Sequence, residues 1–226
     1  MSCEAQRANA LARDTIELFD DVWELSPGTR ILMLTLTSRS RPLDQTRAML
    51  VDHQKTLKAF WGYERLLTAT LGHFTNIEIT FNIKNGNVLV HVHSHSLVVV
   101  ERGALADHRY IRQVEWVALW QRALKADYKP VVDIRAVKGR DGLSTDPHSI
   151  KGAVREVCKY CLDTNTYLHH DNGNILVRPD VALAFTVATH RRRLTSMDRI
   201  FAQAKKLRKQ RRKAERQAHS GNNPDT

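Results

Sequence analysis

Three histidines alternate with other residues along a short stretch of the chain, at His91, His93 and His95. They belong to the segment VLVHVHSHSLVVV (residues 88–100), whose alternation and β-branched residues predict a strand. Because successive side chains of a strand point to opposite faces, the three imidazoles share one face of a sheet. Imidazole is a common metal ligand that is also acceptable at a surface. The pattern therefore predicts either a metal site or a solvated row of histidines.

The residues before this strand predict a partner strand that carries a carboxylate. Residues 76–82 (NIEITFN) alternate strictly, and Asn85-Gly86 favours a two-residue type I′ hairpin turn. That turn places Glu78 opposite His93, and directly opposed residues have Cβ atoms about 4.5–5.5 Å apart. The same register pairs Thr80 with His91 and Asn76 with His95. One carboxylate and two or three imidazoles then converge, a mixed ligand set that suits Mn²⁺ or Mg²⁺ acting on a phosphate, with zinc as the alternative.

The segment REVCKYC (residues 155–161) offers two chemistries. Cys158 and Cys161 form a C-x-x-C, which can be half of a zinc site or a redox pair. Glu156 and Tyr160 are four residues apart, with a lysine between them. At about 100° per residue, a helix over residues 149–162 places the cysteines with the apolar stripe and puts Glu156 and Tyr160 together on a polar face. We interpret the cysteines as packing residues, while the Glu/Tyr pair taken alone fits either chemistry or an ordinary solvated helix face.

The remaining periodicity predicts the elements that must hold these residues. After an amphipathic N-terminal helix, we expect the order β-α-β-β-α-β-α. This order is typical of an α+β, ferredoxin-like (split βαβ) fold, in which an antiparallel sheet has helices mainly on one face and leaves the other face free. The predicted strands are residues 31–37, 76–82, 88–100 and 130–138, and the predicted helices are residues 1–22, 42–62, 110–126 and 149–162.

The composition is that of an ordinary globular protein in water. The 226 residues include 42% apolar and 26% charged residues. The longest apolar runs are too short to cross a bilayer, and the N-terminal residues do not resemble a signal peptide. Three cysteines do not make the disulfide framework of a secreted protein. We therefore expect a cytoplasmic protein with no membrane partner.

The net charge of +11 is concentrated in one segment. Residues 191–216 contain twelve Lys and Arg side chains against two acids, so they carry almost all of the excess. Such segments usually bind nucleic-acid phosphates, and a solubilising tail without a partner is the alternative. We divide the chain into an N-terminal helical extension (1–28), a main domain (29–201) and a basic, largely disordered tail (202–226). The candidate DNA-binding residues are Arg191, Arg192, Arg193, Lys205 and Lys206.

Three segments, taken in their order, resemble the motifs of plasmid rolling-circle replication initiators of the HUH endonuclease superfamily, in the group with a Glu/Tyr third motif. ILMLTLT (31–37) is similar to the first motif, HVHSHSLVVV (91–100) to the second and EVCKY (156–160) to the third. The resemblance covers roughly residues 29–201, and the order and spacing of the set are more specific than any one motif. Val92 and Ser94 depart from the second motif, where proline and a hydrophobic residue are usual.

The resemblance implies a metal-dependent enzyme that nicks and rejoins DNA. It places the metal-binding pair on His93 and His95, with Glu78 as a third ligand from the neighbouring strand. His91 is then a flanking residue or an alternative ligand. The implied cofactor is a divalent metal, Mn²⁺ or Mg²⁺.

The same resemblance implies roles for the residues of the third motif. Tyr160 is the nucleophile that forms a 5′-phosphotyrosine, and Glu156 is the base that activates water when replication ends. Lys159 contacts the scissile phosphate or lowers the pKa of the phenol, which is otherwise near 10. Tyr167 is a less favoured candidate for a second nucleophile.

The implied partners are plasmid origin DNA, as a double-stranded hairpin and as a single-stranded nick site, together with a host helicase and polymerase. Two alternatives remain open. One is a relaxase or single-strand transposase of the same superfamily, which differs in its DNA substrate. The other is a non-catalytic nucleic-acid-binding module on a ferredoxin-like sheet, which would bind nucleic acid without cleaving it. RNA binders of that kind expose aromatic residues on the sheet, whereas this sheet offers histidines and a carboxylate.

Overall fold

The structure is a computed structural model that describes residues 3–138, 150–158, 168–171 and 174–221. Its strands are β1 (Arg30–Thr37), β2 (Arg41–Pro42), β3 (Gly72–Lys84), β4 (Asn87–Val100), β5 (Val132–Ala136), β6 (Leu168–Asp171), β7 (Asn174–Val177) and β8 (Thr195–Met197). Six of them form one antiparallel sheet in the order β5-β1-β4-β3-β8, with β2 paired to β4. Strands β6 and β7 form a separate hairpin.

Seven α-helices and one 3-10 turn lie in the described part of the chain. They are α1 (Cys3–Leu25), η1 (Leu43–Gln45), α2 (Thr46–Trp61), α3 (Glu64–Ala69), α4 (Gln113–Leu124), α5 (Lys151–Val157), α6 (Pro179–Thr189) and α7 (Ile200–Gly221). The predicted α+β class with an antiparallel sheet is therefore confirmed. None of the described helices combines the length and the apolar character that a membrane crossing needs.

The hairpin of β3 and β4 is the one that the sequence predicts. Asn85 and Gly86 at its turn have φ angles of 50° and 76°, the positive values that a type I′ turn requires. The register is also as predicted: Glu78 faces His93, Asn76 faces His95 and Thr80 faces His91. The pairing runs without interruption from the start of β3 to the turn, so the alternation of side chains is preserved along the whole hairpin.

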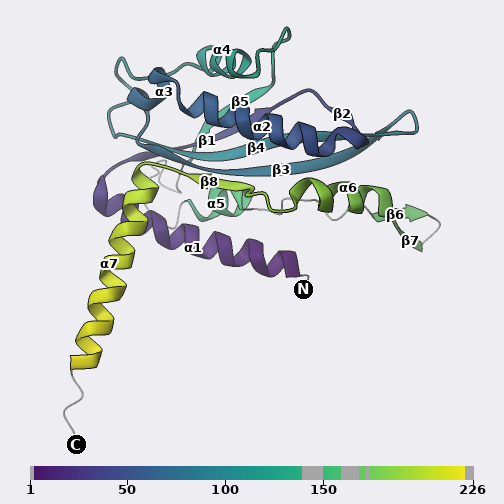
Figure 1. Ribbon diagram of the computed structural model, residues 1–226. Helices are drawn as coiled ribbons and strands as arrows, with labels where there is room; N and C mark the ends of the chain where they lie inside the picture. The colour runs from purple at the N-terminus through teal and green to yellow at the C-terminus, as the bar shows by residue number, and fades with distance from the viewer. Residues whose placement is uncertain (1–2, 139–149, 159–167, 172–173, 222–226) are drawn as a thin grey trace, which may run out of the picture.

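One face of the sheet packs against α2 and α4 (Figure 1). The apolar side chains on this face alternate with those on the other, as the period of a strand requires. Phe60 of α2 lies edge-on to Trp120 of α4, with ring centroids 5.4 Å apart, and both rings are fully buried. The strand residues buried in this layer are Leu32, Leu34, Leu36, Ile77, Ile79, Phe81, Val90, Val92, Val98, Val100 and Val132.

Helices α1, α5 and α7 cover part of the opposite face, which corrects the prediction that helices lie mainly on one face (Figure 1). The physical reason is that one half of this face is apolar and must be shielded from water. The sheet residues buried there are Ile31, Phe74, Leu97 and Val99. The other half carries the three histidines, which remain only half-buried.

Residues 200–221 form one helix, whereas the sequence predicted a largely disordered tail from residue 202. Phe201 and Ala204 of α7 are fully buried in the layer that α7 shares with α1. A charged segment is disordered when it can bury too little apolar surface. Here α1, which is distant along the chain, buries the apolar residues of α7. Helix α6 and strands β6, β7 and β8 were not among the predicted elements.

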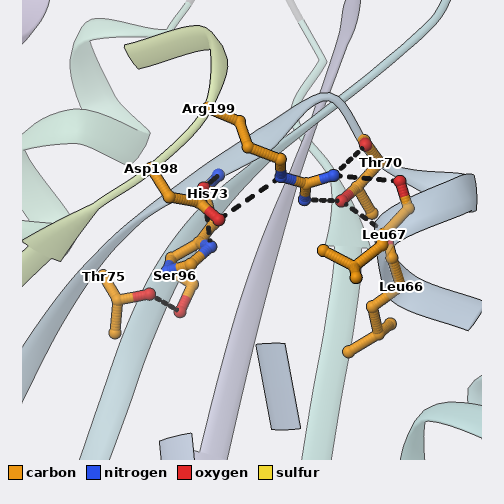
Figure 2. A network of polar contacts seen from close by, with 8 residues as sticks. All are labelled: Leu66, Leu67, Thr70, His73, Thr75, Ser96, Asp198 and Arg199. Atoms are coloured by element: carbon orange, nitrogen blue, oxygen red, sulfur yellow. Dashed lines mark hydrogen bonds and ion pairs between the residues drawn. The ribbon is translucent and has the colours of Figure 1, made fainter. Parts of the chain in front are cut away.

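The start of α7 is joined to the sheet by a polar network (Figure 2). Asp198 accepts a hydrogen bond of 2.9 Å from the backbone N–H of His73, and its Oδ1 lies 3.0 Å from Nδ1 of that residue. The guanidinium of Arg199 donates to the carbonyl and the hydroxyl of Thr70, at 2.7 and 2.6 Å. Burial alone would raise the pKa of Asp198, but the hydrogen bonds from His73 outweigh it and lower the pKa. Helix α7 therefore leaves the sheet from a fixed point.

Candidate metal centre

Three side chains on the histidine-bearing face converge on one point. Oε2 of Glu78 lies 3.2 Å from Nε2 of His93 and 3.2 Å from Nε2 of His95. The three potential ligand atoms all lie within 4.8 Å of one another. Each side chain is 14–20% exposed, so the group is sheltered but remains accessible from one side. The adjacent strands β3 and β4 hold them together, because the two histidines alternate on β4 and Glu78 faces His93.

The carboxylate of Glu78 is held in its charged form. Burial by itself would raise the pKa of Glu78, but hydrogen bonds from His93 and His95 outweigh burial and lower the pKa to about 2. A carboxylate that is ionised far below neutral pH is ready to bind a cation. The group therefore has one negative charge facing two imidazole nitrogens.

A residue of the neighbouring strand β1 contacts the ring nitrogen of His95 that does not face Glu78. Nδ1 of His95 lies 3.0 Å from the hydroxyl oxygen of Thr35, which is its direct neighbour across the two strands. A ring N–H at Nδ1 that donates to that hydroxyl would leave the lone pair of Nε2 free for a metal ion, whereas without an ion a proton on Nε2 donates to Glu78. Partners of this kind fix the tautomer and the ring orientation of metal-binding histidines. Thr35 was not among the residues singled out from the sequence.

His91 lies beside the group and is not part of it. Its Nδ1 is 3.3 Å from the hydroxyl of Ser40, and its ring stacks on that of His93 with centroids 5.2 Å apart. Burial and, after it, the nearby His93 lower the pKa of His91. Among the described residues, only Glu78, His93 and His95 form a group of this kind. The structure therefore brings together two of the three histidines.

The donor set fits a divalent metal ion. Two imidazole nitrogens and one carboxylate oxygen on one face are the ligands that open two-histidine, one-carboxylate sites use. No fourth His, Cys, Asp or Glu joins the group within the described ranges. A bound ion would therefore keep coordination positions for water or for a phosphate oxygen.

Helix α5 carries the described part of the third motif. Ile150, Val154 and Val157 are fully buried with α1 and α7, and this packing sets the helix against β4. Glu156 lies off this apolar stripe and is half-buried. Cys158 is 2% exposed and its sulfur lies 3.8 Å from the hydroxyl of Thr15, so its predicted role as a packing residue is confirmed. Four residues named from the sequence, Lys159, Tyr160, Cys161 and Tyr167, lie outside the described residues.

The basic residues predicted to bind DNA lie in two separate places. Arg191, Arg192 and Arg193 form the exposed turn between α6 and β8, where a side-chain N–H of Arg192 lies 3.4 Å from the amide oxygen of Gln54 on α2. Lys205 and Lys206 are exposed on α7. None of the five belongs to the metal-ligand group.

A further buried histidine had no signal in the sequence pattern. His53 of α2 is 2% exposed and lies edge-on to Trp120, with ring centroids 5.5 Å apart. Burial, followed by the nearby His93 and His91, lowers the pKa of His53 to about 3. It occupies a position on the apolar stripe of α2, where sequence periodicity alone predicts an ordinary core residue.

The fold and the site define an α+β protein with a candidate divalent-metal centre on one face of an antiparallel sheet. A family model described as "Replication protein" matches residues 2–225, and the chain belongs to this family. No solved structure shows a significant match to the chain.

Curated relatives agree with this assignment. A "Protein rep" of Bacillus sp is 34% identical over 168 residues, which cover 68% of this chain and 53% of that protein. A "Protein rep" of Bacillus amyloliquefaciens is 37% identical over 125 residues, covering 55% of this chain and 35% of the relative. A "Replication protein" of Staphylococcus aureus is 26% identical over 178 residues, covering 78% and 72%. The chain thus spans about half the length, or less, of the first two of these relatives.

Proposed function

We propose that this chain is a metal-dependent, tyrosine-type nicking and joining enzyme of the HUH superfamily that starts rolling-circle replication at a plasmid origin. The observation that carries the proposal is the convergence of Glu78, His93 and His95 on one sheet face. The membership of the Replication protein family supports a role at a replication origin. A divalent ion at such a site would serve phosphodiester cleavage, because it can polarise a phosphoryl oxygen and stabilise developing charge.

The strand order supports a ferredoxin-like core. Strands β5, β1, β4 and β3 are adjacent in this order and antiparallel, while α2 and α4 connect β1 to β3 and β4 to β5. That connectivity agrees with the split βαβ arrangement and so supports the proposed fold. Helices α1, α5 and α7 are then additions on the opposite face, and they cover its apolar half without covering the histidines.

Glu78, His93 and His95 would hold Mn²⁺ or Mg²⁺. When bound, the ion would polarise the scissile phosphate and offset the negative charge that builds up on it. Two imidazole ligands favour Mn²⁺ of the two, because Mg²⁺ prefers oxygen ligands. Thr35 would keep His95 in the tautomer whose Nε2 is free to coordinate.

Tyr160 is the proposed nucleophile. Its phenolic oxygen forms a bond to phosphorus while the bond from phosphorus to the 3′ oxygen breaks, and the 3′ oxygen leaves as a hydroxyl that a polymerase can extend. The phenol must lose its proton for this attack, and Lys159 would help by lowering its pKa or by contacting the phosphate. The product is a 5′-phosphotyrosine that retains the energy needed to rejoin strands.

Glu156 is the proposed base of the terminating step. It would accept a proton from a water molecule that attacks the phosphotyrosine, and this hydrolysis would release the enzyme. Its place on the polar side of α5, away from the buried stripe, supports a role in contact with solvent. The partners proposed for the cycle are origin DNA, as a hairpin and as a single-stranded nick site, and a cytoplasmic host helicase and polymerase.

The test is Tyr160→Phe, assayed with Mn²⁺ and a single-stranded origin oligonucleotide labelled at its 3′ end. The unaltered protein should retain the label as a covalent adduct on denaturing gels, because the 5′ phosphate of the labelled fragment is joined to tyrosine. The variant should bind the oligonucleotide with unchanged affinity and form no adduct. Tyr167→Phe is the matched control and should still react.

Cleavage by Tyr160→Phe would show that the nucleophile is misassigned. Binding of DNA without cleavage by the unaltered protein, at any divalent metal concentration, would favour a non-catalytic binding module instead. A strict requirement for a transfer origin or a transposon end would favour a relaxase or a transposase.

A further inference from the structure

Helix α7 carries its cations on two faces with different surroundings. Arg208 and Arg211 face α1, where they donate hydrogen bonds of 2.8 and 2.9 Å to the two carboxylate oxygens of Asp21. The side chain of Asp21 is only 5% exposed. Glu17 and Glu24 of α1 add ion pairs to the same two arginines. The inner face of α7 is therefore neutralised by α1.

A second face of α7, next to the first and bordering α1, carries a stripe of cations with no such partners. We call this set, Lys205, Lys209, Arg212, Lys213 and Arg216, the basic stripe of α7. At about 100° per residue its members fall within an arc of roughly 100°. All five are exposed, and none has an ion pair or a side-chain hydrogen bond within the part of the chain that the structure describes. Together with Asp14 and Leu18 of α1 and with Arg208, they line a groove of about 500 Å³ beside α1, in which Asp14 is the single acidic residue.

The spacing of the stripe makes its members repel one another. Lys205 and Lys209, Lys209 and Lys213, and Arg212 and Arg216 are each four residues apart, and like charges at this spacing destabilise a helix. The helix keeps these charges because α1 holds its other face. An anionic partner would remove the repulsion, and the regular row of cations suits a regular row of anions.

We propose that the basic stripe of α7 binds the backbone phosphates of double-stranded DNA, without reading its sequence. This inference rests on the proposed function, since it assigns duplex DNA to a protein that acts at an origin. From Lys205 to Arg216 the stripe is roughly 16 Å long, at 1.5 Å per residue. This length spans roughly five nucleotides of one strand at 3.4 Å per nucleotide. A helix with its side chains is about 10–12 Å wide, which matches a major groove of about 12 Å.

The placement of α7 suits this role. The helix projects away from the sheet and past α1 (Figure 1), and the five residues of the stripe are exposed. Its first turn is fixed to β3 and to the end of α3 through Asp198 and Arg199 (Figure 2). Duplex bound to the stripe would therefore be held in a set direction from the sheet that bears the metal centre.

A duplex fits the stripe better than an anionic membrane surface does. A helix that lies on a membrane needs bulky apolar side chains beside its basic face. The large apolar residues at the start of α7, Ile200 and Phe201, are 5% and 0% exposed because they pack inside the protein. The exposed surface of the helix is charged and polar, which suits phosphates without lipid chains.

The test uses the full chain with the substitutions Lys209→Gln, Arg212→Gln and Lys213→Gln combined. Binding to a fluorescent duplex of about 20 base pairs is measured by anisotropy between 50 and 200 mM salt. Loss of three phosphate contacts should lower the slope of log K against log salt by about 2.7, at about 0.9 per contact. The affinity at the lowest salt should fall at least tenfold. Nicking of the single-stranded oligonucleotide should change less than twofold.

The matched control is Lys55→Gln, Lys58→Gln and Lys125→Gln combined, which removes the same charge from exposed positions on and next to α2 and α4. It should keep the slope of the unaltered protein. Equal slopes for the two triple variants would overturn the proposal, and so would stripe-dependent binding to phosphatidylserine vesicles with unchanged duplex binding. A protein that never nicks DNA but loses duplex binding through the stripe would refute the proposed function and leave this inference standing.

Discussion

The orientation of a ligand at the candidate metal centre depends on a neighbouring residue that is not itself a ligand. Glu78, His93 and His95 supply the ligand atoms, but the direction of His95 is set from the next strand by Thr35. The neighbouring threonine of the same strand, Thr37, donates its hydroxyl to the carbonyl of Val131 instead. These two threonines have the same chemistry and different partners, which allows the role of Thr35 to be isolated.

Thr35→Val should weaken Mn²⁺ binding about tenfold, because the ring N–H of His95 loses its partner and the imidazole can turn or change tautomer. Thr35→Ser keeps a hydroxyl and should restore the affinity. Isothermal titration with Mn²⁺ on the DNA-free protein measures this directly and does not depend on activity. Thr37→Val is the matched control and should leave the affinity unchanged. An equal loss in both valine variants would assign the effect to general disturbance of β1.

Among the elements, α1 and α7 show how two distant segments can order each other. The two helices lie at opposite ends of the chain, and their contact combines buried apolar residues with the clasp of Asp21 by Arg208 and Arg211. A helix of this charge density is unfavourable alone. The prediction of a disordered tail failed because the stabilising partner lies about 190 residues away along the chain.

Asp21→Ala should lower the free energy of unfolding by about 2 kcal/mol, because it removes a buried acceptor shared by two arginines that remain partly exposed to water. Hydrogen exchange should become faster for the amides of α7 while those of β3 and β4 are unaffected. Asp44→Ala, at an exposed position on η1, removes the same charge and is the control. Unchanged protection of α7 would mean that apolar packing alone holds the helix.

For the whole molecule, the metal centre links β3 and β4 and should couple ion binding to stability. A ligand that binds only the folded state at about 100 times its Kd adds about 2.7 kcal/mol to the free energy of unfolding. For a chain of this size that corresponds to a rise in Tm of about 5–10 °C. Thermal unfolding with Mn²⁺, and again after chelation with EDTA, should show this rise and its reversal.

His95→Ala should abolish the rise in Tm, and His91→Ala should retain it, because His91 lies outside the ligand group. The two variants remove the same side chain from the same strand, so they differ mainly in the distance of the ring from Glu78. A rise of equal size in both variants would contradict the assignment of the ligands. Loss of the rise in both would add His91 to the set.

The sequence by itself determined the hairpin and its register. Asn85-Gly86 specifies its turn locally, and strict alternation then decides which residue faces which, so Glu78 and His93 could be paired without any long-range information. The interpretation of Cys158 as a packing residue also followed from local periodicity, since the position of a residue on a helix depends only on its neighbours.

Only the tertiary structure decided three features. These are which helices cover the second face of the sheet, which histidine is not part of the ligand group, and which residue hydrogen-bonds to a ligand. Thr35 and His95 are 60 residues apart, and Asp198 and His73 are 125 residues apart. No local pattern marks either pair, because a single hydrogen bond between distant segments leaves no periodicity in the sequence. The charges of α7 can likewise be read from the sequence. Which of them form ion pairs with α1 depends on how the two helices pack, and no local pattern shows this.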